Sequence, residues 1–364
     1  MRWTGIEAMP SRRSFLGGVL AAAGCPSLGW AAAGAPAYLS AARNGQGLYV
    51  LIGLCADASI AFSIPLPDRG HAAAAHPTRA EAVAFARRPG TYALVIGCAQ
   101  GVVLHRMRAP AGRHFYGHGA FSADGETLFT TENEIATGAG RIGIWDVTQG
   151  YRRSGEVASG GIGPHEIVRL PGRDRFAIAN GGIRTHPRTG RQKLNLDAMR
   201  PNLTVINGAG QVIDKASLPN RLHQNSLRHI AAFADGRVAC AFQWQGDPFA
   251  APSLAGIYTP GAGLAAVPMQ DDVLYGLDGY AGSVAVMDGY TMALTYPRGG
   301  AIQIFDTAMG TDTVLRQMDI CGVAGAMVTD GLGRVSRIDH TTLEPLAQHP
   351  LAFDNHLVLI GQEE

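Results

Sequence analysis

The feature that most constrains the fold is a repeated unit of short apolar strands separated by turns rich in Gly, Pro, Asp and Asn. Each copy begins near a histidine, runs through an apolar strand to a glycine-containing tip, and continues through two or three more strands. The histidines that open the four clearest copies are His76, His118, His165 and His229, which lie 42, 47 and 64 residues apart. Two weaker copies begin near residues 283 and 325. A four-stranded antiparallel unit repeated at this spacing is typical of a propeller blade.

The two ends of the chain predict how the ring closes. Six copies are visible, whereas the N-terminal strands at 48–54 and 59–66 lack a first strand and the C-terminal run 356–360 lacks companions. Pairing them would complete another blade and remove the exposed sheet edges. We therefore predict an all-β fold, a single β-propeller of about seven four-stranded blades closed by its N- and C-terminal strands. A pair of β-sandwiches is the alternative.

The composition indicates a globular chain and does not suggest a nucleic-acid partner. Hydrophobic residues make up 46% of the 364 residues and charged residues 16%, and 48 glycines suit a fold with many tight turns. The formal net charge is +1 with no concentrated basic patch, so we expect no nucleic-acid partner.

The first residues resemble a leader for export of a folded protein. Arg12 and Arg13 lie in a twin-arginine motif, an uncharged run follows from Phe15 to Ala33, and small-residue cleavage sites lie at 33–37. We predict a twin-arginine signal peptide at 1–37, handled by the twin-arginine translocase, and a β-propeller domain at 38–364 in the periplasm. A lipid anchor at Cys25 is a minor alternative, as is an ordinary N-terminal helix or membrane anchor.

Four cysteines remain beyond this leader, and their spacing matches no metal motif. They are Cys55, Cys98, Cys240 and Cys321. We expect small core residues at these positions, although an exported protein also permits a disulfide.

The repeated histidines are the main reason to expect a site. Loops that enter the innermost strands line one mouth of the channel, so these histidines should gather there, and histidine is both a common metal ligand and an acid or base near neutral pH. The metal candidates are His118, His165 and His229, with a transition metal as the candidate cofactor. The alternative is that each histidine makes a structural hydrogen bond between blades. No catalytic motif is present, so no catalytic residue is assigned.

Polar neighbours and loops extend the candidate ligand-binding set. The excursion at 179–197 interrupts the third blade, and long loops in compact blades are often functional. A Gln and an Arg that follow later strands would suit an anionic ligand near the channel. The full set is His118, Glu132, Asn133, His165, Glu166, Asn180, His186, His223, Arg228, His229, Gln243 and Arg298.

Several sequence blocks resemble a known family. They are GHGAFSADGETLFTTENE, GRIGIWDV, SGGIGPHEI with IANGGIRTHP, RQKLNLDAMRPNL and HQNSLRHI. They are similar to the bacterial domain-of-unknown-function family numbered 1513. The resemblance implies a periplasmic propeller of the WD40/YVTN type and supplies no catalytic residues. It also implies, through neighbouring genes, a role in iron handling with an imelysin-like or haem-protein partner.

Three functions remain open from the sequence. The first is a non-enzymatic binding or scaffold protein associated with imelysin-type iron handling, motivated by the absence of a catalytic motif and by the long loop. The second is a His-rich metal-binding protein with its site at the channel mouth. The third is a propeller enzyme of lactonase or oxidoreductase type, for which Glu132 and Glu166 are the nearest carboxylates.

Overall fold

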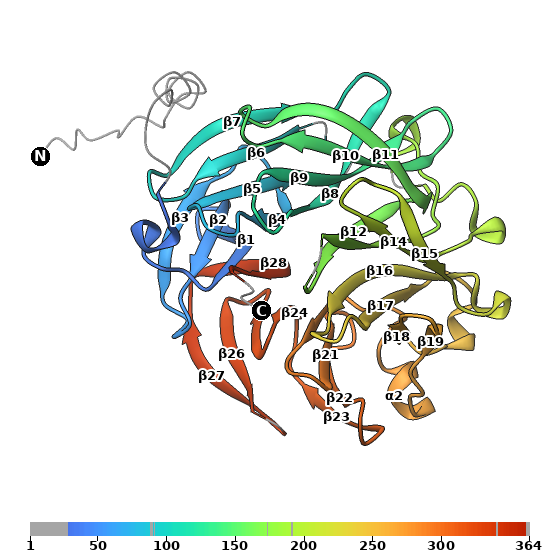
Figure 1. Cartoon of the computed structure of the whole chain (residues 1–364). Helices are drawn as coiled ribbons and strands as arrows, with labels where there is room; N and C mark the ends of the chain where they lie inside the picture. Colours follow the sequence, from blue (N-terminus) through green and yellow to red (C-terminus); the bar gives the residue numbers. More distant parts are fainter. Residues whose placement is uncertain are drawn as a thin grey trace, which may run out of the picture.

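The computed structural model describes residues 28–361 except 88, 89, 91, 173, 191 and 340, and in it seven four-stranded antiparallel sheets form a ring (Figure 1). The predicted seven-bladed propeller is therefore confirmed. The first strand of each blade lines the centre and contacts the first strand of the next blade.

The second and third blades in chain order begin with strands that contain the predicted histidines, whereas blade 1 begins with a strand that precedes His76. Their strands are β4 (Gly70–Ala75), β5 (Glu81–Ala86), β6 (Tyr92–Gly97) and β7 (Val102–Arg108) in blade 1, β8 (Arg113–Phe121), β9 (Thr127–Glu134), β10 (Ala139–Asp146) and β11 (Arg152–Ile162) in blade 2, and β12 (Pro164–Leu170), β13 (Arg175–Asn180), β14 (Asn202–Asn207) and β15 (Val212–Ala216) in blade 3.

Three further blades complete the run. Their strands are β16 (Asn225–Ala232), β17 (Val238–Trp244), β18 (Ala255–Thr259) and β19 (Gly263–Ala266) in blade 4, β20 (Ser283–Val286), β21 (Thr291–Tyr296), β22 (Ala301–Asp306) and β23 (Thr311–Arg316) in blade 5, and β24 (Ile320–Ala324), β25 (Met327–Asp330), β26 (Arg334–Asp339) and β27 (Thr342–Gln348) in blade 6.

The seventh, closing blade joins the two chain ends as predicted. The C-terminal strand β28 (Leu351–Leu359) is innermost and pairs with β1 (Tyr38–Asn44), which is followed by β2 (Tyr49–Leu54) and β3 (Ile60–Pro65). The sequence did not predict β1, because this strand directly follows the expected leader and carries polar residues at its end.

Short helices occur only in loops of the described part of the chain. They are η2 (Trp30–Ala33), η3 (Pro187–Thr189), η4 (Leu196–Ala198), η5 (Asn220–Leu222), η6 (Pro248–Ala250) and α2 (Asp271–Tyr275). Among the described residues no helix has the length and apolar content needed to cross a membrane. The long loop predicted in blade 3 joins β13 to β14 and contains η3 and η4.

Each interface between neighbouring blades has its own apolar core in the described part of the chain. Between blades 2 and 3, for example, the rings of Phe129 and Phe176 lie 4.4 Å apart, and both side chains are fully buried. The blades are buried on both faces, and for this reason their middle strands are nearly continuously apolar in sequence. The stacked cores fix the innermost strands, and hence the channel side chains, relative to one another.

The segment before β1 packs against blade 1. The backbone N–H of Ala80 donates to the carbonyl of Leu28 at 2.6 Å, Gly29 pairs with Arg79, and the indole N–H of Trp30 donates to the carbonyl of His76 at 2.9 Å. The twin-arginine motif and Cys25 lie outside the described residues, and the leader at 1–37 stays a prediction.

The four cysteines of the propeller are free thiols, and no two of them are bonded. Three are buried and Cys55 is half-buried, as expected for small core residues.

Candidate metal centre

Six innermost strands carry an irregularity in the described part of the chain. In each, the hydrogen-bond register with the second strand of the blade shifts, which is the signature of a β-bulge. The residues of the innermost strand that lie inside the shift are His71 and Ala72 in β4, residues 116–118 in β8, His165 in β12, Arg228 in β16, Cys321 and Gly322 in β24, and residues 354–356 in β28. A bulge re-aims its side chains, and five of these six bulges contain or adjoin a histidine, the exception being the bulge of β24.

The five histidines so placed form one cluster in the channel. They are His71, His118, His165, His229 and His356. These rings make eight ring–ring contacts, with centroids 4.5 to 6.2 Å apart. All except His71, which is partly exposed, are at most 6% exposed. The structure thus brings together the three predicted metal candidates and adds two histidines that the sequence analysis did not select.

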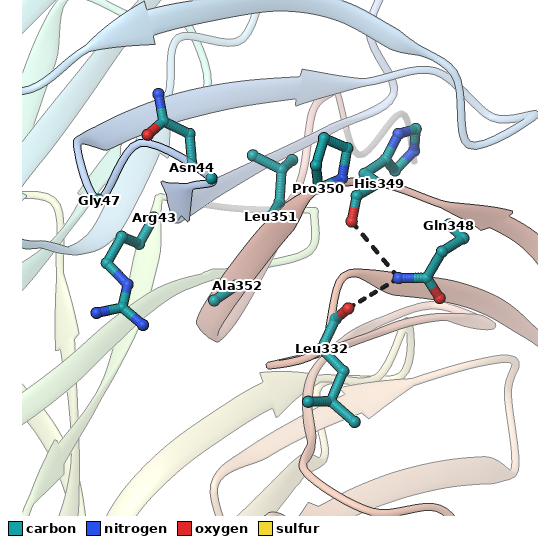
Figure 2. Close-up of a pocket in the computed structure, with 10 residues that line it drawn as sticks. Arg43, Asn44, Gly47, Leu332, Gln348, His349, Pro350, Leu351 and Ala352 are labelled. Carbon is teal, nitrogen blue, oxygen red and sulfur yellow. Dashed lines mark hydrogen bonds between the residues drawn. The ribbon is translucent and has the colours of Figure 1, made fainter.

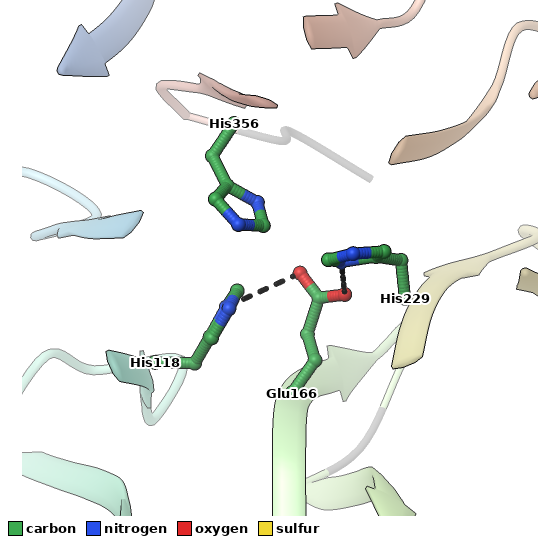
Figure 3. Close-up of side chains that lie close together, drawn as sticks. All are labelled: His118, Glu166, His229 and His356. Carbon is green, nitrogen blue, oxygen red and sulfur yellow. Dashed lines mark ion pairs between the residues drawn. The ribbon is translucent and has the colours of Figure 1, made fainter. Parts of the chain in front are cut away.

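Glu166 places a carboxylate among these rings (Figure 3). Its Oε1 lies 3.4 Å from Nδ1 of His118, and its Oε2 lies 3.3 Å from Nδ1 of His229. The backbone N–H of Ile230 donates to Oε2 at 2.9 Å and fixes the carboxylate. His356 approaches from the opposite side in Figure 3, so one Glu and three His surround a common point.

Burial and charge set the protonation of the cluster. Burial, reinforced by neighbouring cationic side chains and histidines, lowers the pKa of His71, His165 and His356 well below 6.5. Burial also lowers the pKa of His229, although Glu166 opposes the effect. Burial would raise the pKa of Glu166, but His118 and His229 outweigh it and hold this pKa below its ordinary range. The cluster therefore combines imidazoles that favour the neutral form with one carboxylate anion.

The donor distances fit coordination of an ion better than direct hydrogen bonding. Charge-assisted N–H···O bonds are about 2.7–2.9 Å long, whereas the two contacts of Glu166 measure 3.4 and 3.3 Å. A tetrahedral ion with bonds of about 2.0–2.1 Å separates its ligand atoms by roughly 3.3–3.4 Å. The donor atoms of His118, Glu166, His229 and His356 all lie within 4.8 Å of one another.

Several ring nitrogens of the cluster are buried without a hydrogen-bond partner. These atoms are Nδ1 of His71, Nε2 of His118, Nδ1 of His229 and Nε2 of His356. Buried polar atoms are nearly always paired in proteins, and each exception needs an explanation. A bound ion would engage such lone pairs.

The cluster opens toward the mouth at which the innermost strands begin. His71 and Glu166 stand near the starts of β4 and β12 and are partly exposed, so an ion can approach from this side. Asp354 lies at the same mouth, two residues before His356, and is bound by Arg69 at 2.8 Å, with Arg87 at 3.8 Å. These charged side chains lie at the mouth and are not among the donor residues of the cluster.

The other residues of the candidate set that neighbour the repeats have structural partners. Glu132 forms an ion pair with Arg153 on the outer strand of its blade, at 2.6 Å, and Asn133 contacts His114 at 3.3 Å. Arg228 adjoins the histidine–Glu166 cluster, because its carbonyl accepts a hydrogen bond from His165 at 3.0 Å. The predicted candidates that lie outside the cluster are Glu132, Asn133, Asn180, His186, His223, Gln243 and Arg298.

The remaining candidates stabilise loops and blades. Asn180 bonds Ser159, Asn202 and Thr204, and Gln243 donates to the carbonyl of Ala281 at 3.0 Å. The other three lie at loops, as follows: His186 caps η3, His223 bonds the carbonyl of Asn220, and the exposed Arg298 stacks on Tyr280.

His76 differs from the other opening histidines. It follows the end of β4 rather than its start, and its Nδ1 accepts from the backbone N–H of Thr78 and of Arg79, at 3.2 and 3.0 Å. The channel histidine of this blade is instead His71, five residues earlier. The prediction that His76 opens this blade at the channel mouth was therefore wrong, and the two histidines stand at opposite ends of a run of four alanines.

A hollow elsewhere on the molecule carries no comparable chemistry. It has a volume of about 600 Å³ and lies between blade 6 and the closing blade, lined by Arg43, Asn44, Gln348, His349 and neighbours (Figure 2). The imidazole of His349 is engaged with the carbonyl of Ala58 at 2.9 Å. None of the residues that line this hollow belongs to the histidine cluster.

Comparison with known proteins places the chain in a family. The model of the family described as "Protein of unknown function (DUF1513)" matches residues 64–360. The chain belongs to this family. The DUF1513 match covers blades 1 to 6 and strand β28, and with them every member of the histidine cluster. No curated protein matches the chain.

Solved structures show that the DUF1513 chain shares the propeller fold. One is hydrazine synthase of Kuenenia stuttgartiensis, with a TM-score of 0.58, 11% identity and coverage of 82% of this chain and 88% of that one. The WD40 repeats of RRP9 give a TM-score of 0.60 at 14% identity, covering 81% and 85%. U3-55K gives 0.60 at 13% identity, covering 81% and 86%. At these identities the likeness is one of fold alone.

Proposed function

We propose that this protein binds a divalent transition-metal ion in its channel, through His118, Glu166, His229 and His356. The observation that carries the proposal is the convergence of one donor atom from each of these four residues, all within 4.8 Å of one another. Each contact of Glu166, 3.4 Å to His118 and 3.3 Å to His229, has the length of one edge of a coordination tetrahedron. The rest of the argument concerns charge, ligand preparation and the choice of ion.

Charge balance favours a cation at this point. Ligating imidazoles must be neutral and a ligating carboxylate must be ionised. The lowered pKa values of His229, His356 and Glu166 favour these forms. Without an ion, the partly exposed carboxylate of Glu166 has one short hydrogen bond among the described residues, from the backbone N–H of Ile230.

The donor set points to a class of ions. Three imidazoles and one carboxylate suit zinc, copper, nickel or iron rather than calcium or magnesium, which take oxygen ligands. At equilibrium, imidazole-rich sites bind copper and zinc more tightly than ferrous iron. Zn²⁺ is therefore our first probe ion.

The test is the metal content of the propeller and of matched variants. EDTA-stripped protein is dialysed against equimolar Zn²⁺, and bound zinc is measured by inductively coupled plasma mass spectrometry. We expect the wild type to retain zinc and His356→Asn to lose it. The control is His105→Asn, an exposed histidine on the outermost strand of blade 1, which should retain wild-type zinc. Equal retention by His356→Asn and wild type would overturn the proposal.

The cellular setting stays a prediction from the sequence. Export by the twin-arginine route, a periplasmic location, and an imelysin-like or haem-protein partner in iron handling are compatible with a channel metal site. A pull-down of the metal-loaded protein with such a partner, compared with the His356→Asn variant, tests whether the ion and the partner are connected.

A further inference from the structure

We propose that the channel holds a second metal ion, bound by His71, His118 and His165 and joined to the first through His118. The inference rests on the proposed function, because His118 belongs to both groups. The donor atoms of these three histidines lie within 4.8 Å of one another, as do those of the first group.

One ion leaves part of the cluster unused. A tetrahedral ion takes four ligands, which the first group supplies, yet the bulges of β4 and β12 also bring His71 and His165 into the channel. Nδ1 of His71 is buried without a partner, and leaving such an atom unbound costs free energy. A second ion gives both residues a role.

The geometry of the second group is that of a three-histidine site. Its ring centroids are 5.0 Å apart for His71 and His118, 5.1 Å for His118 and His165, and 5.6 Å for His71 and His165. Rings bound through nitrogen to one tetrahedral ion at about 2.0–2.1 Å have centroids roughly 5 Å apart.

The free nitrogens of the group are also consistent with a second ion. Nδ1 of His165 is engaged with the carbonyl of Arg228 at 3.0 Å, which is the usual outer contact of a ligating histidine and leaves Nε2 available. Nδ1 of His71 is buried without a partner. Each of these two histidines therefore offers one nitrogen.

His118 can serve both ions because its two nitrogens face different surroundings. Nδ1 faces Glu166, a ligand of the first ion, and Nε2 is buried without a partner. Binding through both nitrogens requires an imidazolate, so the remaining ring proton leaves to solvent when the second ion binds. The ring gains a negative charge that the additional dication offsets.

The experiment uses Cu²⁺ as the probe, because paramagnetic ions joined by one ring reveal their coupling. EDTA-stripped full-length propeller is titrated with Cu²⁺, bound copper per chain is measured by mass spectrometry, and spins per chain are counted by electron paramagnetic resonance. We expect two copper ions per wild-type chain with far fewer than two detectable spins. His165→Asn and His71→Asn should each bind one copper with one full spin, and His105→Asn should match the wild type.

The outcomes separate this inference from the proposed function. One copper with one spin in the wild type, unchanged in His165→Asn, would overturn the second ion and leave the first site standing. Two copper ions with two full spins would overturn the bridge through His118. No bound copper at all would overturn the proposed function itself. Two variants of the second group are used so that a folding defect in one, seen by circular dichroism, does not decide the result.

Discussion

Removing the negative charge of Glu166 should weaken metal binding and reduce the stability that the metal adds to the propeller. Glu166→Gln keeps the size of the side chain and an oxygen for the backbone N–H of Ile230, but it removes the carboxylate that faces His118 and His229 at 3.4 and 3.3 Å. The variant therefore changes a ligand while leaving the surrounding contacts intact.

The size of the effect follows from the four donors of the site. Four-ligand structural zinc sites bind with about 10–16 kcal/mol, or roughly 2.5–4 kcal/mol per ligand. Loss of one ligand should weaken binding by about 10² to 10³-fold. At a free Zn²⁺ concentration about 1,000 times the wild-type Kd, the wild type gains about 4.1 kcal/mol of stability. By the same relation the variant gains only about 0.4–1.4 kcal/mol.

The assay is thermal unfolding with and without zinc. The missing stabilisation of about 3 kcal/mol should reduce the zinc-induced rise in Tm by about 4 °C, at roughly 1.4 °C per kcal/mol for a chain of this size. The matched control is Glu344→Gln on the outermost strand of blade 6, whose carboxylate is exposed. A Glu166→Gln protein that zinc stabilises as much as the wild type would refute the reasoning.

Three more outcomes are expected. Gly117→Ala should lower the stability of the fold by about 1–2 kcal/mol, because φ is +104° at this residue. It should also reduce copper binding at the second group, because the added Cβ would strike the ring of His71. An unchanged copper stoichiometry by mass spectrometry would contradict this. The metal-free protein should lose stability as pH falls below 6.5, by up to about 1.4 kcal/mol per pH unit for each of His165 and His356. The reason is that these two histidines take up protons at a higher pH in the unfolded chain than in the folded one. A midpoint of urea unfolding that does not change between pH 7.5 and 5.5 would argue against this. The sequence predicts cleavage at 33–37, but the pairing of the Leu28 carbonyl with blade 1 favours a cut before Leu28, and an intact mass that begins at residues 34–38 would support the first site and contradict the second.

The architecture could be predicted from the sequence because the blades share the same local sequence pattern. Apolar strands and Gly-containing turns recur in every blade, and the orphan strands at both ends implied the closing blade. Three strands were missed at the starts of blades. The predicted copies began at His76 and near residue 325, after β4 and β24, and β1 becomes recognisable only through its pairing with β28.

The site was predicted only in part, because it depends on bulges. His118, His165 and His229 were selected as repeat-opening histidines, and the structure places all three in the channel. His71 and His356 were missed since a register shift within a strand has no clear sequence signal, and one residue of slip moves a side chain to the other face. Glu132 was expected near the channel but is paired with Arg153 inside its blade.

The most direct test of the metal site is a crystal structure of the zinc-loaded protein, with diffraction data collected above and below the zinc absorption edge. We expect an anomalous peak in the channel, at about 2.0–2.2 Å from donor atoms of His118, Glu166, His229 and His356. A channel with no anomalous peak, in which the Glu166 oxygens make direct short hydrogen bonds to the rings of His118 and His229, would contradict the account.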